Sequence, residues 1–242
     1  MAIGNVTPDS FYAASRLSDE ESVVAWARKA LEDGADILDI GACSTRPNST
    51  PVDESEEWRR LEPALTALRK ALPDARLSLD TFRPEIARRA LEAFGPMMIN
   101  DVSGGCKQMF ELVRKRNVPY VWTFRHFIET IRRRLSDNQA DLEGVDWILD
   151  PGFGFRGGVE QDYDRLRNLD RLRSFNRPIL VGVSRKSMIY KPLGLTPETC
   201  LAATQALHLY ALEHGASILR THDVRETAQT VSLWEKIQNH QS

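Results

Sequence analysis

The sequence contains little cysteine and no long apolar run. Its cysteines are Cys43, Cys106 and Cys200, an odd number without the close spacing of metal ligands, so neither a disulfide framework nor a zinc site is expected. No apolar stretch approaches the roughly 18 to 20 residues that cross a bilayer, and no signal-peptide pattern opens the chain. We therefore expect a cytoplasmic protein that does not bind or span a membrane.

The chain also lacks an excess of charge of either sign. It carries 32 Lys and Arg residues against 34 Asp and Glu residues, a formal net charge of -2, which argues against general binding to nucleic acid. The run Arg132-Arg133-Arg134 is interpreted as a solvated helix face. No linker rich in Gly, Ser or Pro divides the chain, and 42% of its residues are apolar. We expect one domain that covers residues 1–242.

Short apolar runs alternate instead with longer segments of helical period. Residues such as Trp58, Leu61, Leu65 and Leu68 recur three and four positions apart and form one apolar stripe on a helix. Eight strand candidates lie between such segments, at 2–5, 36–40, 77–80, 97–100, 120–123, 147–150, 179–183 and 217–220. This alternation predicts an α/β fold, a single (β/α)8 TIM barrel, whose usual length is about 250 residues. A doubly wound sheet is the alternative.

Polar side chains recur at the carboxyl ends of these strands, where barrel enzymes build their sites. They are Asn5, Ser44-Thr45-Arg46, Asp80, Asn100-Asp101, Asp150, Ser184-Arg185-Lys186 and Arg220-Thr221-His222-Asp223. A turn or a helix cap would explain any one of them, and Asp-Pro-Gly at 150–152 is ordinary turn chemistry. The whole set at equivalent positions instead indicates a barrel mouth lined with functional groups.

These groups are of two chemical kinds. Asp80, Asn100 and Asp150 offer acceptors and an amide, which suit the N–H-rich edge of a planar ligand. The cationic donors, which match phosphate oxygens, are Arg46, Lys186, Arg220 and His222. We therefore predict a flat nitrogen heterocycle that carries a phosphate or pyrophosphate. Asn5 is a candidate oxygen ligand for Mg²⁺, which binds together with substrate phosphates.

Seven segments of the chain together carry a family resemblance. They are GNVTPDSF (4–11), DILDIGACSTRP (36–47), LSLDT (77–81), INDVSGG (99–105), ILDPGFGF (148–155), VGVSRKSMI (181–189) and ILRTHDV (218–224). In this order and spacing they resemble dihydropteroate synthases, the pterin-binding TIM barrels that sulfonamides target. The resemblance implies a homodimeric transferase of folate synthesis. Such an enzyme condenses 6-hydroxymethyl-7,8-dihydropterin pyrophosphate with 4-aminobenzoate and releases pyrophosphate.

The resemblance also implies a role for each matching residue. The pterin would be held by Asp80, Asn100, Asp150 and Lys186. The departing pyrophosphate would be stabilised by Arg46, Arg220, His222 and Asn5 with Mg²⁺. The 4-aminobenzoate site would be shaped by Thr45, Pro47, Phe155, Ser184 and Lys186. The residues with an implied catalytic role are Asp80, Lys186, Arg220 and His222.

The chain departs from the family pattern after two of its strands. Cys43 and Asn48 replace a loop acid and a loop glycine, and Thr123-Phe124-Arg125 stands where the family has Met-His-Met, before a shortened segment. If Thr123 replaces a pterin-facing methionine, the ring loses apolar surface, and Thr123→Met should tighten pterin binding.

Two alternatives stay open. One is a methyltetrahydrofolate-using methyltransferase on the same barrel, and the other is a non-catalytic pterin-binding relative. The cations within 184–186 and 220–222 argue against the first alternative, because methyl transfer needs no pyrophosphate site. The altered segment after the fifth strand is what supports the second.

Overall fold

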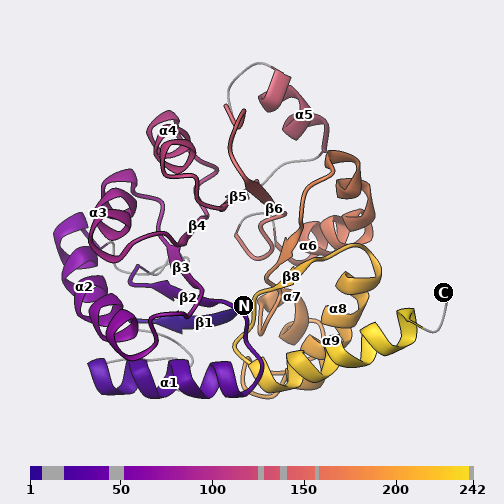
Figure 1. Ribbon diagram of the computed structural model, residues 1–242. Helices are drawn as coiled ribbons and strands as arrows, with labels where there is room; N and C mark the ends of the chain where they lie inside the picture. The colour runs from indigo at the N-terminus through magenta and orange to yellow at the C-terminus, as the bar shows by residue number, and fades with distance from the viewer. Residues whose placement is uncertain (7–18, 44–51, 125–127, 137–140, 156–157, 240–242) are drawn as a thin grey trace.

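Short parallel strands form a closed barrel that is surrounded by helices (Figure 1). The computed structural model describes the chain apart from residues 7–18, 44–51, 125–127, 137–140, 156–157 and 240–242. One six-stranded parallel sheet runs in sequence order through β1 (Ala2–Asn5), β2 (Leu38–Gly41), β3 (Leu77–Asp80), β4 (Met98–Asp101), β5 (Tyr120–Thr123) and β6 (Trp147–Asp150). The remaining strands, β7 (Leu180–Val181) and β8 (Ile218–Leu219), pair with each other.

Two isolated bridges join these sheets into a barrel. Ala2 pairs with Thr221 and Leu149 pairs with Ile179, so that β1 meets β8 and β6 meets β7. Backbone hydrogen bonds accompany both bridges; for example, Ile3 N donates to Thr221 O at 3.0 Å. The predicted TIM barrel is therefore confirmed. The doubly wound alternative is wrong, because such a sheet is open and leaves its two edge strands unpaired.

The helices follow one another around the strands (Figure 1). They are α1 (Glu20–Glu32), α2 (Glu54–Ala71), α3 (Pro84–Phe94), α4 (Lys107–Arg116), α5 (Ile128–Ser136), α6 (Gly158–Arg167), α7 (Ser187–Tyr190), α8 (Leu201–Glu213) and α9 (Val224–Gln238), with a 3-10 helix at Leu169–Phe175. Several begin at clear sequence signals. The Asp19 carboxylate caps α1, the Asp53 carboxylate caps α2, and α3 begins with Pro84.

Alternation along the strands separates an outer core from the barrel interior. Residues such as Leu38, Ile40 and Leu79 belong to the large core that includes the surrounding helices. The interior begins with a small apolar cluster of Met1, Val121, Ile148 and Leu180, against which Ile37, Met98 and Ile218 pack. Two residues further along five of these strands, the same inward positions hold Asp39, Asn100, Thr123, Asp150 and Arg220. The strand pattern thus carries polar groups toward one end of the barrel.

Some predicted strand ends differ from the observed ones. Strand β4 continues to Asp101, whose carboxylate accepts from Tyr120 Oη at 2.9 Å and from the amide of Ser103. Asp101 therefore lies on the helix side of its strand and does not line the mouth. Strands β7 and β8 are shorter than predicted, because only two residue pairs form their ladder.

No helix in the described part of the chain is long and apolar enough to cross a bilayer.

Candidate active site

The carboxyl end of the barrel gathers most of the predicted site residues. Asp80, Asn100 and Arg220 belong to one hydrogen-bonded network, and Asp150 and Lys186 are held by contacts from neighbouring strands and loops. Thr45, Arg46 and Pro47 fall within 44–51, outside the described residues. The structure therefore brings together the predicted acceptors and part of the predicted cationic set.

Arg220, directly after β8, connects three strands. Its Nε donates to Asp39 Oδ2 at 2.7 Å and its Nη2 donates to Asp80 Oδ2 at 2.8 Å. Asp39 Oδ2 also accepts from Asn100 Nδ2 at 3.1 Å. The Asp39 side chain is fully buried, whereas the side chains of Arg220 and Asp80 are 20% and 17% exposed. The cation and one of its carboxylates can therefore meet a ligand.

Asp39 is absent from the predicted site. The sequence does hold a signal for it, because Asp39 lies between the outward residues Leu38 and Ile40 and so must face the barrel interior. A buried carboxylate requires a charged or hydrogen-bonding partner. The partner comes from a strand 181 positions away, which no local pattern identifies.

Burial and neighbouring charges shift the pKa values of the two exposed members of this network. Burial raises the pKa of Asp80 to about 7, against a lowering by Arg220 and with further raising by Asp39, Asp101 and Asp150. Burial lowers the pKa of the Arg220 guanidinium, but Asp39 and Asp80 outweigh this and raise it overall. Arg220 stays cationic, so Asp80 is the member whose charge responds to pH near neutrality.

Replacing Asp80 by Asn should change how stability depends on pH. The folded-state pKa of Asp80, about 7, lies above the unfolded value of about 3.9. Between about pH 4 and 7 the folded protein therefore binds more protons than the unfolded chain, and this group's contribution to the free energy of unfolding falls as pH rises. Buried His208 acts in the opposite direction, because burial lowers its pKa to about 4.

Urea unfolding from pH 5 to pH 8 tests this expectation. The free energy of unfolding of Asp80→Asn should rise more, or fall less, between pH 5 and 7 than that of the unchanged protein, because the His208 contribution remains and the Asp80 contribution is gone. A His208→Gln variant should show the reverse difference. Identical pH profiles for Asp80→Asn and the unchanged protein would show that the Asp80 pKa is not raised.

Asp150 ends β6 and takes part in both a turn and the site. Its Oδ1 accepts from the Gly152 amide at 2.9 Å, and its Oδ2 accepts from Thr123 Oγ1 at 3.0 Å. The interpretation of Asp-Pro-Gly as a turn is therefore correct for one oxygen. Each carboxylate oxygen has a second lone pair, so the turn and the Thr123 contact leave acceptor capacity for a ligand.

Thr123 has a defined partner. It is fully buried and lies directly opposite Asp150 in the β5–β6 ladder. Compared with the methionine of the family, Thr123 has a smaller apolar surface, but it also has a hydroxyl that donates to Asp150. The expectation that Thr123→Met tightens pterin binding is therefore incomplete, because that change would also remove a hydrogen bond from the Asp150 carboxylate.

If Asp150 holds a pterin, as the family resemblance implies, Thr123→Val should weaken pterin binding by about 1.5 kcal/mol, because it keeps the β-branched shape and removes a donor to a charged acceptor. Thr123→Ser keeps the hydroxyl and should bind the pterin within a few-fold of the unchanged protein. Calorimetric titration of all three proteins with the bare pterin measures the difference. Equal affinities for the Val and Ser variants would mean that the hydroxyl does not position Asp150.

The loop after β6 is held from α6 and carries two aromatic residues to Lys186. The buried carboxylate of Asp162 accepts from the Gly154 amide at 3.0 and 3.1 Å and pairs with Arg165 at 2.6 Å. Lys186 Nζ donates to Phe153 O and lies 4.9 Å from the ring centroid of Phe155. Asp162 was not predicted, because its partner is a loop amide that the sequence pattern does not single out.

Gly154 is required in this loop for two reasons. Its φ is +78°, and a Cβ at this position would come within 2.9 Å of Lys186 Cδ. A larger residue would therefore strain the backbone and push Lys186 away from the loop. The glycine lets the loop approach the lysine stem closely.

The loops after β7 and β8 contact each other through two pairs. Ser184 Oγ lies 3.1 Å from His222 Nδ1 and accepts from the His222 amide at 3.2 Å. Arg185, which has a left-handed φ of 55°, pairs with buried Asp223 at 2.6 Å and also donates to Pro197 O. The sequence interpretation counted 184–186 as cationic. Arg185 instead joins the two loops, which leaves Lys186 as the cation of this segment in the described site.

Asn5 ends β1 opposite Gly41 of β2, with a half-buried side chain. Within the ranges that the structure covers, no group of three or more His, Cys, Asp and Glu residues could hold a metal ion. Mg²⁺ commonly keeps waters and substrate phosphates as ligands and needs only one or two protein oxygens. The Asn5 amide oxygen fits a site of that kind and does not fit a cage built from protein alone.

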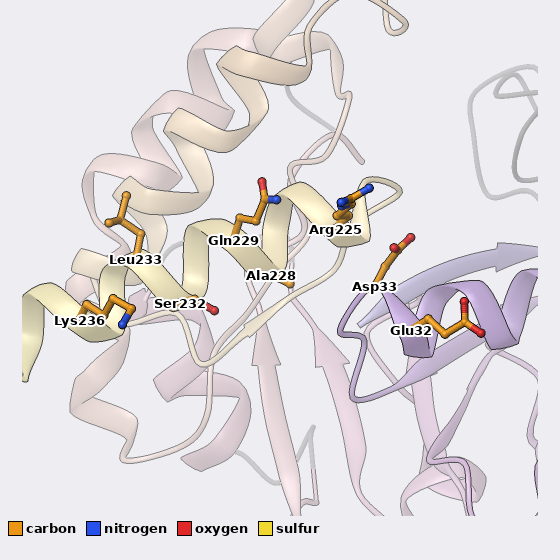
Figure 2. Close-up of a pocket in the computed structure, with 8 residues that line it drawn as sticks. All are labelled: Glu32, Asp33, Arg225, Ala228, Gln229, Ser232, Leu233 and Lys236. Carbon is orange, nitrogen blue, oxygen red and sulfur yellow. The ribbon is translucent and has the colours of Figure 1, made fainter.

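A groove of about 660 Å³ lies between the end of α1 and α9 (Figure 2). Asp33 and Arg225 lie on its two facing walls. The groove holds none of the predicted site residues; its lining is Glu32, Asp33, Arg225, Ala228, Gln229, Ser232, Leu233 and Lys236. The polar groups of the barrel mouth therefore remain the candidate site.

Known proteins resemble this chain over almost its whole length. The family model described as "Pterin binding enzyme" matches residues 1–222. A dihydropteroate synthase of Clostridium beijerinckii is 33% identical over 98% of this chain and 93% of its own length. Two solved dihydropteroate synthases each cover 98% of this chain and 92% of their own, with a TM-score of 0.86. That of Xanthomonas albilineans with 4-aminobenzoic acid is 36% identical, and that of Coxiella burnetii with pteroic acid is 31% identical.

Proposed function

The chain belongs to the pterin-binding enzyme family, among its dihydropteroate synthases, and we propose from this premise how its residues divide the reaction. The reaction joins 6-hydroxymethyl-7,8-dihydropterin pyrophosphate to 4-aminobenzoate and releases pyrophosphate. One observation carries the proposal: Arg220, a cation suited to phosphate, donates to the carboxylate of Asp80, which suits the pterin, at 2.8 Å. The two halves of a bipolar substrate would therefore meet at Arg220.

The pterin lies across the inward ends of β3, β4 and β6. Asp150 accepts hydrogen bonds from its amino-pyrimidine edge, Asn100 offers an amide, and Lys186 donates from the loop after β7. The burial of Asp150 and Asn100, which are 6% and 2% exposed, supports this role, because charge-assisted hydrogen bonds gain strength where water is excluded. Asp80 lies next to Arg220, at the junction of the pterin with its pyrophosphate.

The pyrophosphate leaves toward Arg220 and His222, joined by Arg46 from the undescribed segment 44–51. The C–O bond of the pterin methylene breaks, and its electron pair leaves with the pyrophosphate. Asp80 stabilises the positive charge that develops on the methylene, and Arg220 stabilises the anion. The Asn5 amide oxygen would be one ligand of a bound Mg²⁺, which would supply positive charge to the phosphates.

The aminobenzoate lies between the loops after β6 and β7. Phe155 and the stem of Lys186 form the walls of this site, and Thr45 and Pro47 join them from the segment after β2. Ser184 lies near the carboxylate of the aminobenzoate. The 4.9 Å approach of Lys186 to the Phe155 ring supports a shared platform. The amine nitrogen of the second substrate attacks the methylene and loses a proton.

A coupled assay tests the proposal. Pyrophosphate release should require both 4-aminobenzoate and the pterin pyrophosphate, with the pterin product formed in equal amount. A protein that binds the pterin but releases no pyrophosphate would support the non-catalytic alternative. Methyl transfer from methyltetrahydrofolate without pyrophosphate release would support the methyltransferase alternative.

We further propose that the protein is a homodimer that uses the outer face of α9. Leu233 and Ile237 lie four positions apart on this helix and are 57% and 47% exposed, whereas the exposed Leu193 and Leu195 lie in the loop between α7 and α8. Exposed apolar side chains that share one helix face favour contact with a partner surface. Leu233→Glu/Ile237→Glu should shift the mass measured by light scattering from dimer to monomer. A monomeric unchanged protein, or a double variant that stays dimeric, would exclude this interface.

A further inference from the structure

Asp39 is a buried charge in the site to which neither the family motifs nor the predicted roles assign a function. We infer that Asp39 is a positioning residue that fixes which atom of the Asn100 amide faces the pterin, and that it thereby helps to select a ring with an N–H at that edge. This inference rests on the proposed pterin site. It concerns the choice of ligand within that site.

The chemistry of Asp39 fixes which end of the Asn100 amide faces it. Asp39 Oδ2 lies 2.7 Å from Arg220 Nε and 3.1 Å from Asn100 Nδ2. A carboxylate paired with a guanidinium accepts hydrogen bonds and has no hydrogen to donate. Asn100 must therefore turn its NH₂ group toward Asp39. The reversed amide would place two acceptor oxygens against each other in a buried site.

This orientation leaves the carbonyl oxygen of Asn100 as an acceptor. Asn100 Oδ1 is buried and has no hydrogen-bond partner among the described residues, and the same holds for Asp39 Oδ1. An unpaired acceptor in a dry site costs free energy, and a ligand N–H that reaches it removes this cost. A ligand that presents a ring nitrogen lone pair at the same position would leave two acceptors facing each other.

Arg220 links this polarity to the anion half of the site. Its Nε hydrogen bond holds Asp39, while Nη2 reaches Asp80. The same carboxylate therefore orients a cation for the pyrophosphate and an amide for the pterin. A change at Asp39 that lets the residue accept from Arg220 and donate to Asn100 should affect both halves, whereas a change at Arg220 should affect mainly the anion.

The test compares reduced and altered pterins on Asp39→Ser. The serine hydroxyl can accept from Arg220 Nε and can either accept from Asn100 or donate to it, so Asn100 can turn in either direction. The probes are 6-hydroxymethyl-7,8-dihydropterin, its fully oxidised form, in which a ring N–H becomes a ring nitrogen acceptor, and its 2-oxo analogue, in which the amino group becomes an oxygen. Calorimetry gives the affinity ratio of the reduced pterin to each analogue.

We expect at least one of these ratios to fall about tenfold or more in Asp39→Ser, because the variant no longer excludes an acceptor at that edge. Arg220→Lys is the matched control. It keeps the Asp39 carboxylate and a positive charge, so it should weaken pyrophosphate binding and keep both ratios close to those of the unchanged protein. If Asp39→Ser does not fold, Asp39→Ala gives the same test, because it leaves no acceptor at position 39 to fix the Asn100 amide.

Three outcomes decide the inference. A reduced ratio in the Asp39 variant and an unchanged ratio in Arg220→Lys support it. Unchanged ratios for both analogues in the folded Asp39 variant overturn it, as does an equal loss in Arg220→Lys. Failure of the unchanged protein to bind the dihydropterin at all would instead overturn the proposed function on which the inference rests.

Discussion

Arg220→Ala should lower the free energy of unfolding by about 3–5 kcal/mol, because removing one partner of a buried ion pair leaves an uncompensated buried charge. Here the change leaves two carboxylates without their shared cation. Asp39 is fully buried and pairs with Arg220 at 2.7 Å, and Asp80 is 17% exposed and pairs with it at 2.8 Å. Urea unfolding at pH 7.5, where Asp80 of the unchanged protein is mostly ionised, measures the loss.

Arg88→Ala is the matched control for this change. Arg88 also contacts two carboxylates, Glu85 and Glu92, but all three side chains are 44% exposed. Water and salt screen exposed ion pairs, which therefore contribute little to stability, so this variant should unfold close to the unchanged protein. If Arg220→Ala also unfolds there, the Arg220 network does not stabilise the fold.

Adding Asp80→Asn to Arg220→Ala should restore part of the lost stability, since the double variant buries one charge fewer. The same logic predicts that Arg220→Ala is closer to the unchanged protein at pH 5 than at pH 7.5, because protonation of Asp80 removes its charge. Turnover should not return in the double variant. The guanidinium that stabilises the leaving pyrophosphate is still missing, and its contribution is largest as the anion forms.

Local sequence patterns were sufficient to predict the barrel. Eight short apolar runs alternate with segments of helical period along the chain, and such a series of similar spacing predicts a barrel. The places of Asp80, Asn100 and Asp150 at the carboxyl ends of their strands predicted that they line one mouth. Their chemistry then predicted the N–H-rich edge of a ligand.

The partners of these residues were harder to predict, because each one depends on a contact between distant segments. Arg185 and Lys186 are neighbours in sequence, yet Arg185 pairs with Asp223 and Lys186 contacts Phe153 O. A left-handed φ of 55° at Arg185 separates the two directions. Non-glycine residues adopt that conformation rarely. Nothing in the sequence therefore indicated that Arg185 and Lys186 point in different directions, and the interpretation treated 184–186 as one cationic group.

Asp150→Asn separates the turn role of this residue from its proposed role in binding. The Asp150 Oδ1 accepts from the Gly152 amide, which can only donate, so an asparagine must place its carbonyl oxygen there. Its NH₂ group then takes the place of Oδ2, next to Thr123 Oγ1. The threonine hydroxyl can rotate and accept, so we expect the loop to keep its turn and the protein to fold.

The proposed ligand contact does not survive the same change. The NH₂ group at the Oδ2 position would meet the N–H edge of the pterin, so a donor would face a donor. Loss of one partner from a buried, charged hydrogen-bond pair commonly costs about 2–5 kcal/mol. We therefore expect pterin binding to weaken by at least about thirtyfold, which is the lower end of that range at about 1.4 kcal/mol per tenfold.

Calorimetry with the bare pterin and urea unfolding should be measured on the same preparations of Asp150→Asn and Asp150→Ala. The alanine variant loses both roles, because it can accept neither from Gly152 nor from the ligand, and it should be the less stable of the two. The asparagine variant should unfold near the unchanged protein and still fail to hold the pterin. Near-normal pterin affinity in a folded Asp150→Asn protein would assign Asp150 to the turn alone, and the amino-pyrimidine edge would then need another acceptor at this end of the barrel.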